Sequence, residues 1–162
     1  MISNGVKFNT GMALVEIIIG SAIISGGVLA AIVSYNTYVN YALANNKNIQ
    51  ASYLLEEGLE VMTFFRDSGW TANISGLSTS TTYYLNYSSG AWATTTTPQY
   101  VDGVFLRSIS VSDVKRDAID QISASGTYDP NTKKITATID YLQGQATTTK
   151  SLSLYITNIN AN

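Results

Sequence analysis

Residues 17–33 read IIIGSAIISGGVLAAIV, an almost unbroken apolar run, and no charged residue occurs from Ile17 to Asn46. Together with Met12 to Val15, this run is long enough to form about 30 Å of α-helix, which matches the thickness of the hydrocarbon core of a bilayer. The stretch therefore predicts a single transmembrane segment at about residues 13–35.

The few polar and small residues in this run are compatible with a membrane helix. Ser21 and Ser25 can hydrogen-bond back to helix carbonyls. Gly20, Gly26 and Gly27 allow neighbouring helices to approach closely or the helix to melt locally, or they are simply tolerated in a membrane span. The sequence leaves these three interpretations of the glycines open.

The helical pattern continues beyond the membrane segment, because no proline occurs before Pro98. Apolar residues recur at helical spacing from residue 49 to residue 65, and acidic residues fall mainly on the other side. The apolar stripe consists of Ile49, Tyr53, Leu55, Leu59, Met62 and Phe65, and the other side of Glu56, Glu57, Glu60 and Arg66. We expect one helix from about Met12 to Phe65, ended by Asp67, Ser68 and Gly69.

After Trp70 the sequence changes to turns and short runs with β-type composition. Four runs alternate apolar and polar residues or are rich in β-branched and aromatic types: 83–87, 103–111, 134–142 and 151–159. The segment DPNTKK (129–134) predicts a turn, a second connection is expected at 143–145, and loops at 78–82 and 94–97. The expected fold class is α+β, with a long N-terminal helix packed on a C-terminal antiparallel β-sheet.

Composition excludes several kinds of chemistry. The 162-residue chain has no Cys, no His and a net charge of −2, so zinc sites, thiol chemistry and a role based on nucleic-acid binding are not expected. Asp113, Asp117 and Asp120 lie among basic residues and predict a solvated turn, and Asp129 lacks the acidic neighbours of a calcium site. We expect no enzyme activity, no metal and no cofactor.

The most specific stretch is KFNTGMALVEIII (7–19). A basic residue, a Gly and a Glu five positions into an apolar helix resemble the class III signal of type IV prepilins and type II secretion pseudopilins. The later run YLLEEGLEVMTFFRD (53–67) resembles the second half of the long pseudopilin helix. Met12 stands where the family usually has Phe, and Lys7 is the only basic residue of the leader.

This resemblance implies processing and assembly. Residues 1–11 would be a leader peptide removed after Gly11, Met12 would become the methylated N-terminus, and Glu16 would act in assembly. Residues 12–67 would form the helix and 68–162 the β-rich domain. The implied partners are other pilin or pseudopilin subunits, a prepilin peptidase/methyltransferase, an inner-membrane assembly platform and membrane lipid. The implied location is the cell membrane, with the C-terminal domain periplasmic or extracellular.

A carboxylate in an apolar helix costs several kcal/mol unless it is paired or reaches the interface. Glu16 could pair with the new α-amino group of a neighbouring subunit, which would favour one axial register, or it could be solvated near the headgroups. Two other functions remain open. One is a single-pass anchored surface protein whose β-domain binds carbohydrate or protein. The other is a secreted β-domain with an ordinary signal peptide cut near Ala30 or Ala31.

Overall fold

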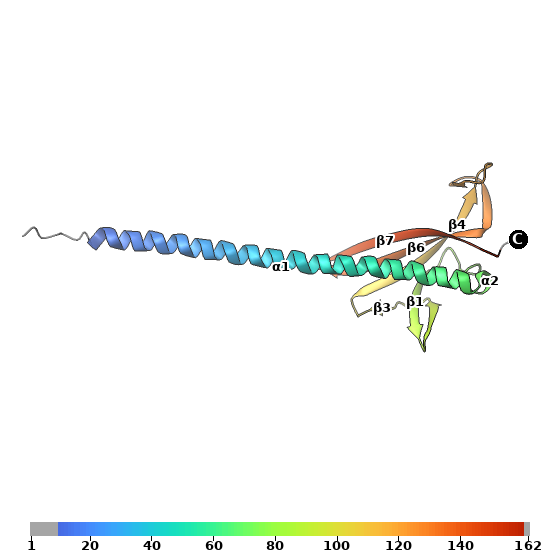
Figure 1. Cartoon of the computed structure of the whole chain (residues 1–162), viewed down its shortest axis with the longest axis horizontal. Coiled ribbons are helices and arrows are strands. Elements are labelled where there is room, and N and C mark those ends of the chain that lie inside the picture. Colours follow the sequence, from blue (N-terminus) through green and yellow to red (C-terminus); the bar gives the residue numbers. More distant parts are fainter. Residues whose placement is uncertain (1–9, 161–162) are drawn as a thin grey trace, which may run out of the picture. The chain divides into compact units, whose positions relative to one another are not determined.

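The structure is a computed structural model that describes residues 10–160. Two helices come first, α1 (Thr10–Ser68) and the single-turn α2 (Trp70–Asn73) (Figure 1). Seven strands follow: β1 (Thr82–Ser88), β2 (Ala91–Thr95), β3 (Tyr100–Val101), β4 (Phe105–Arg116), β5 (Ile122–Ser123), β6 (Thr127–Gln143) and β7 (Ala146–Thr157). This arrangement confirms the α+β class and the long N-terminal helix.

The chain divides into two compact units within α1. The first extends to Asn45, and the second comprises residues 46–162, so that the last part of α1 belongs with the sheet. Gly69, which has a φ of 146°, follows the end of α1 and separates it from α2. The expected stop at residues 67–69 is confirmed. The division into a leader, a helix and a β-domain stays a prediction.

The sheet is antiparallel, with strand order β2-β1-β4-β6-β7, and β3 and β5 also pair with β4. β4, β6 and β7 form the expected C-terminal meander, in which Ile109 lies opposite Ala137, and Ala137 opposite Leu152. Ser89 and Gly90 both have positive φ, as the tight turn between β1 and β2 requires. The loops expected at 78–82 and 94–97 are shorter than predicted, because Thr82 begins β1 and Thr94 and Thr95 belong to β2.

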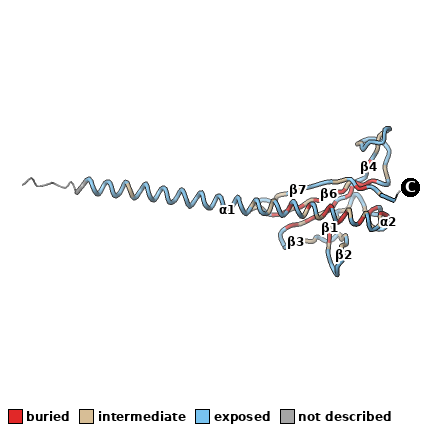
Figure 2. The backbone as a smooth tube through the Cα atoms, in the orientation of Figure 1, coloured by how far each residue is buried: buried red, intermediate tan, exposed pale blue. Residues whose placement is uncertain are grey.

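The core lies between the last part of α1 and one face of the sheet, where buried residues gather in Figure 2. Its helix residues are Ala51, Leu55, Leu59, Val61, Met62 and Phe65, and its sheet residues include Ile109, Val111, Ile135, Ile139, Tyr141 and Ile156. Fully burying side chains of this size contributes about 1.5–3 kcal/mol each. This cluster therefore supplies the main stabilisation of the second unit.

The predicted apolar stripe on α1 is wrong at its first two positions. Ile49 and Tyr53 are 47% and 68% exposed, whereas Ala51 is completely buried. Residues two positions apart project about 200° from each other around a helix, so Ile49 and Tyr53 face away from the line that Ala51 occupies. The buried side of the helix instead contains the small residues Ala51 and Gly58. At Gly58 the helix backbone lies close to side chains of the sheet.

Arg107 of β4 is a buried cation beneath α1, only 3% exposed. Its guanidinium forms an ion pair with Glu57 and donates a hydrogen bond to the carbonyl of Leu54 at 3.3 Å. Its Cζ lies 5.5 Å from the centre of the Trp92 ring. The sequence predicted that Glu57 faces away from the sheet, but Glu57 turns toward it. The pairing explains this orientation, because removing water from an unpaired charge such as that of Arg107 is costly.

The turn predicted at residues 129–134 is also wrong. These residues lie within β6, where the pairing with β4 passes from Asp113↔Lys133 directly to Val114↔Asp129. The segment 130–132 is therefore an insertion in the ladder, a bulge and not a reversal. Proline is tolerated in a strand at such a bulge, where its missing N–H takes no part in the ladder.

Two ion pairs flank this bulge. The Nζ of Lys133 lies 2.6 Å from Asp113 Oδ1 and donates to the Tyr128 hydroxyl at 3.1 Å. On the other side, Arg116 Nε lies 2.6 Å from Asp129 Oδ2. The predicted solvated turn is only partly right, because Asp113 lies inside β4. Asp117 does form a turn and accepts the backbone N–H groups of Ile119 and Gln121.

Candidate functional site

The first unit is the part of α1 from Thr10 to Asn45, and its apolar side chains are exposed (Figure 2). Large residues along it, such as Met12 and Ile17, are more than 70% exposed. The most apolar 18-residue window of this helix has a mean hydropathy of 2.3, and none of it is buried. Among residues 10–160, one helix is long and apolar enough to cross a membrane, by length and composition.

Three hydroxyl groups in this unit donate hydrogen bonds to carbonyls of the helix itself. Ser21 donates to the Ile18 carbonyl, Ser34 to Ala30 and Thr37 to Val33, each at 2.9 Å. A polar group without such a partner would cost several kcal/mol in hydrocarbon. The expectation for Ser21 is confirmed. The Ser25 hydroxyl forms no hydrogen bond within residues 10–160, so the expectation for Ser25 is not confirmed.

Gly20, Gly26 and Gly27 lie in uninterrupted α-helix. A Cβ atom built at any of them would meet no other atom within 4 Å. No contact with another part of the described chain therefore requires glycine at these positions. Close approach of a second helix remains one of the three interpretations of these residues.

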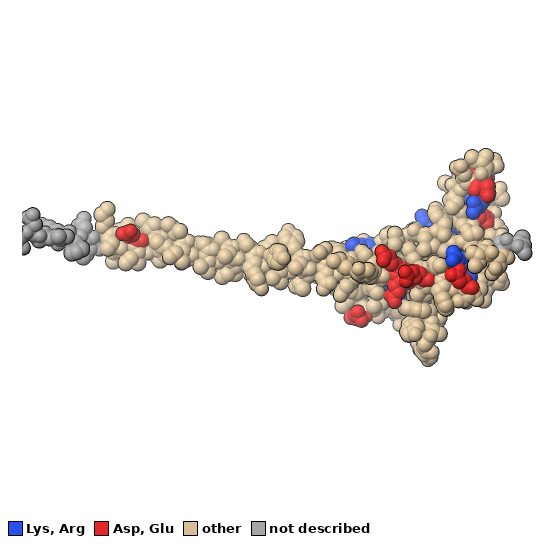
Figure 3. All heavy atoms as spheres, viewed as in Figure 1, with Lys and Arg blue, Asp and Glu red and all other residues tan. Residues whose placement is uncertain are grey.

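Glu16 is the only charged residue between Thr10 and Asn46, and it is exposed. Figure 3 shows acidic atoms near the start of α1, with no basic atoms beside them among the coloured, described residues on this face. Ile17 and Ile19 beside it are 71% and 55% exposed. No ion pair reaches Glu16 within the described part of the chain. Both pairing with a cation from outside the helix and solvation therefore stay open for Glu16.

The predicted processing site lies at the start of α1. Gly11 and Met12 are both helical, one and two residues after the first helical residue, Thr10. Met12 is 73% exposed. Most of the predicted leader, residues 1–9, lies outside the described residues. Cleavage after Gly11 and methylation of Met12 therefore stay predictions.

Asp129, the acidic residue that the sequence suggested for a calcium site, is paired with a cation, Arg116. Burial opposes ionisation of Asp129, but hydrogen bonds from Arg116, Thr132 and the Asn131 N–H outweigh it and lower the pKa of its carboxyl. The same hydrogen bond with Asp129 raises the pKa of Arg116. Among residues 10–160, no three His, Cys, Asp or Glu side chains gather as a metal site would need.

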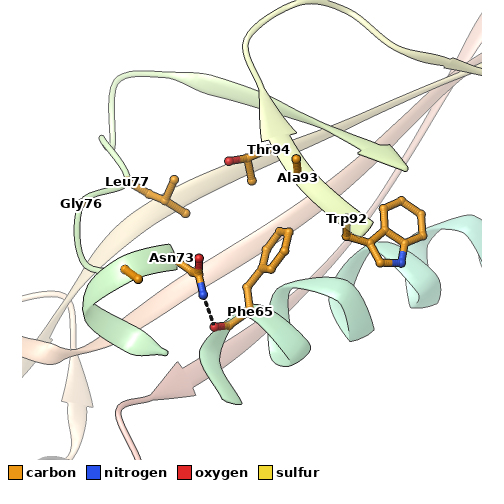
Figure 4. A pocket seen from close by; sticks show the side chains of 8 residues that line it. Phe65, Asn73, Gly76, Leu77, Trp92, Ala93 and Thr94 are labelled. Atoms are coloured by element: carbon orange, nitrogen blue, oxygen red, sulfur yellow. Dashed lines mark hydrogen bonds between the residues drawn. The ribbon is translucent and has the colours of Figure 1, made fainter. Parts of the chain in front are cut away.

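Two clefts mark the second unit. One lies between β2 and the segment after α2, over the ring of Phe65, and Figure 4 shows Asn73, Leu77 and Thr94 around it. Asn73 is fixed there by donating its side-chain amide to the Phe65 carbonyl at 3.2 Å. The lining of this cleft is uncharged: Phe65, Ala72, Asn73, Gly76, Leu77, Trp92, Ala93 and Thr94.

The second cleft is a shallow groove of about 410 Å³ between α1 and β7. Its floor is apolar and its helix side is acidic; the lining residues are Glu56, Leu59, Glu60, Thr63, Phe64, Asp67, Leu152 and Leu154. The sequence did not predict this groove. Two of its large apolar residues, Phe64 and Leu152, are 56% and 44% exposed.

No family model, no curated protein and no solved structure matches this chain. The candidate site therefore consists of what the chain itself presents: an exposed apolar helix with one carboxylate, Glu16, and a separate folded unit of helix and sheet.

Proposed function

We propose that this chain is a structural subunit, a pseudopilin or minor pilin, of a type IV pilus-like or type II secretion filament. It is cleaved after Gly11 and assembled through the first part of α1. The observation that carries the proposal is an apolar helical surface, exposed from Met12 to Val33, that contains a single carboxylate. A surface of this kind is stable only in lipid or against other apolar helices.

Glu16 and the new N-terminus would guide assembly. Cleavage after Gly11 creates an α-amino group on Met12, four residues or about 6 Å of helix rise from Glu16. In an apolar surrounding of low dielectric, an ammonium and a carboxylate attract each other strongly, and each is costly alone. Pairing between adjacent subunits removes both unpaired charges at one axial register, so a growing filament accepts the next subunit in that register.

The location follows from the same surface. Before assembly the apolar part of α1 spans the membrane at about residues 13–35, and the second unit lies outside, in the periplasm or beyond the cell. The proposed partners are further pilin or pseudopilin subunits, a prepilin peptidase/methyltransferase, an inner-membrane assembly platform and lipid. No catalytic activity is part of this proposal.

The test uses the full chain purified from its native membranes, with two measurements. Intact mass and N-terminal peptide mass are expected to show a start at Met12 carrying one methyl group. Filament material that sediments from sheared cells is expected to fall about tenfold or more in Glu16→Gln, which keeps the shape of the side chain and removes its charge. Membrane association and the Met12 start should remain in this variant.

The matched control is Asp102→Asn, which removes one carboxylate from a turn in the second unit and should leave sedimentation unchanged. A chain that still begins at Met1 and sediments equally with and without Glu16 would support the anchored surface protein instead. A cut near Ala31 would support a secreted domain.

A further inference from the structure

Three tyrosines follow the apolar run of α1 within the first unit. Tyr35, Tyr38 and Tyr41 are 68%, 73% and 73% exposed, in a part of the helix that is exposed throughout (Figure 2). They are three residues apart, so each ring is turned by about 60° and raised by about 4.5 Å from the one before. The three rings therefore lie on one side of the helix, over about 120° of its circumference.

The other side of this segment is polar but carries no charge. Asn36 and Asn40 are exposed, and each is two residues from Tyr38, about 200° around the helix from it. No Asp, Glu, Lys or Arg occurs between Glu16 and Lys47. An exposed tyrosine in such a segment suits the layer between hydrocarbon and water, where its ring contacts apolar chains and its hydroxyl contacts headgroups or water.

The spacing between these tyrosines and Glu16 matches a bilayer. Residues 17–36 belong to one uninterrupted helix and rise about 30 Å along it, which is the thickness of the hydrocarbon core. When Tyr38 lies in the headgroup layer on one side, Glu16 therefore lies at the headgroups on the other side. A carboxylate at that depth keeps contact with water and does not bear the cost of a charge in hydrocarbon.

We propose that Tyr35, Tyr38 and Tyr41 bind the lipid headgroup layer at the outer surface of the membrane and fix the depth of the subunit before assembly. Lipid is the partner because the tyrosines directly continue the exposed apolar surface of the same helix. At this depth Glu16 is hydrated at the inner surface, and its charge becomes costly only when the subunit enters an apolar filament. This inference rests on the proposed function, which supplies the membrane and the orientation of the chain.

The absence of Cys from the sequence allows the depth to be measured with single cysteines in the full chain. Three variants, Ala13→Cys, Ile24→Cys and Asn40→Cys, replace exposed residues of the first unit and leave Glu16 and the tyrosines in place. Right-side-out and inverted vesicles from native membranes, freed of filaments by shearing, are treated with a charged maleimide. We expect Asn40→Cys to react only in right-side-out vesicles and Ala13→Cys only in inverted ones. Ile24→Cys should react about tenfold more slowly in both, because a charged reagent does not enter hydrocarbon.

The tyrosines themselves are tested by replacing all three in the Asn40→Cys chain, either by Leu or by Trp. Leucine extends the apolar run and should draw position 40 into the hydrocarbon, so that its reaction slows about fivefold. Tryptophan keeps a ring with a polar edge that prefers the headgroup layer, so the rate should stay as with tyrosine. Because position 40 lies on the other side of the helix from the replaced rings, direct contact with them does not explain a difference in rate.

Equal rates in the leucine and tryptophan chains would show that the rings do not set the depth and would overturn the inference. Slow reaction of Asn40→Cys in native vesicles that becomes fast in vesicles of phosphatidylcholine and phosphatidylglycerol would also overturn it, since another protein would then cover the segment. If the Met12 start and the effect of Glu16→Gln hold while the reaction pattern differs, only this inference fails. If those two are absent while the reaction pattern is as expected, the proposed function fails and the tyrosines set the depth of an anchored protein.

Discussion

Asp129 is the residue at which pH should act on the stability of the second unit. It is held at 2.6 Å from Arg116, and hydrogen bonding lowers the pKa of its carboxyl below the ordinary value despite burial. A carboxyl whose pKa is lower in the folded than in the unfolded chain stabilises the fold above its unfolded pKa, about 4. That stabilisation is lost as the pH falls through the folded pKa.

We therefore expect the free energy of unfolding to decrease as the pH is lowered from about 5 toward 3. In Asp129→Asn this decrease should be smaller, and the variant should be about 1 kcal/mol less stable at pH 7. Urea unfolding of the full chain in detergent, followed by tryptophan fluorescence, measures both. Asp102→Asn is the control, because its carboxyl forms no ion pair in the described residues. Equal acid sensitivity of Asp129→Asn and the wild type would contradict this role.

At the scale of single elements, Gly58 determines how closely α1 approaches the sheet. A Cβ atom at this position would lie 3.1 Å from Arg107 Cδ and 3.6 Å from both Ala137 Cβ and Ile109 Cδ1. Gly58→Val should therefore separate the helix from β4 and β6 and destabilise the second unit by about 1–3 kcal/mol, as overpacked cores do. Thermal unfolding of the full chain in detergent measures this loss.

The control for this change is Gly76→Val. A Cβ at Gly76 would meet nothing within 4 Å, so the melting temperature should change little. If Gly58→Val melts at the wild-type temperature, the close contact between helix and sheet is not what stabilises the unit.

The elements themselves were largely predictable, because hydrophobic periodicity and turn residues are local signals. The helix, its end near Gly69 and the strands of the meander follow from them. The burial of Ala51 and Gly58 was not predictable, because small residues carry little hydrophobic signal and matter only once a sheet lies opposite. Pro130 and its neighbours predicted a reversal, and only the partner strand β4 shows that they form a bulge. Ion pairing of Glu57 with Arg107 likewise joins residues far apart in the sequence.

At the scale of the whole molecule, the two units are stabilised in different ways. The second unit has its own core of helix and sheet side chains, whereas none of the most apolar window in α1 is buried. The apolar side chains of the first unit therefore find no cover within the described part of the chain, whereas those of the second unit do. Changes in the first unit should alter membrane association and assembly without unfolding the second.

Ile24, which is 69% exposed, tests this separation. Residues 17–33 contain nine Ile, Leu and Val residues, which favour membrane insertion by about 3–5 kcal/mol together. An Arg near the centre costs about 3 kcal/mol and also removes the contribution of Ile24. Ile24→Arg should therefore release most of the chain from membranes during alkaline carbonate extraction, while Ile24→Leu should behave as the wild type. Because Ile24 is outside the folded core, the protease resistance of the second unit should be the same in all three proteins. Full retention of Ile24→Arg in the membrane would contradict a transmembrane role for this helix, and loss of protease resistance would contradict the independence of the two units.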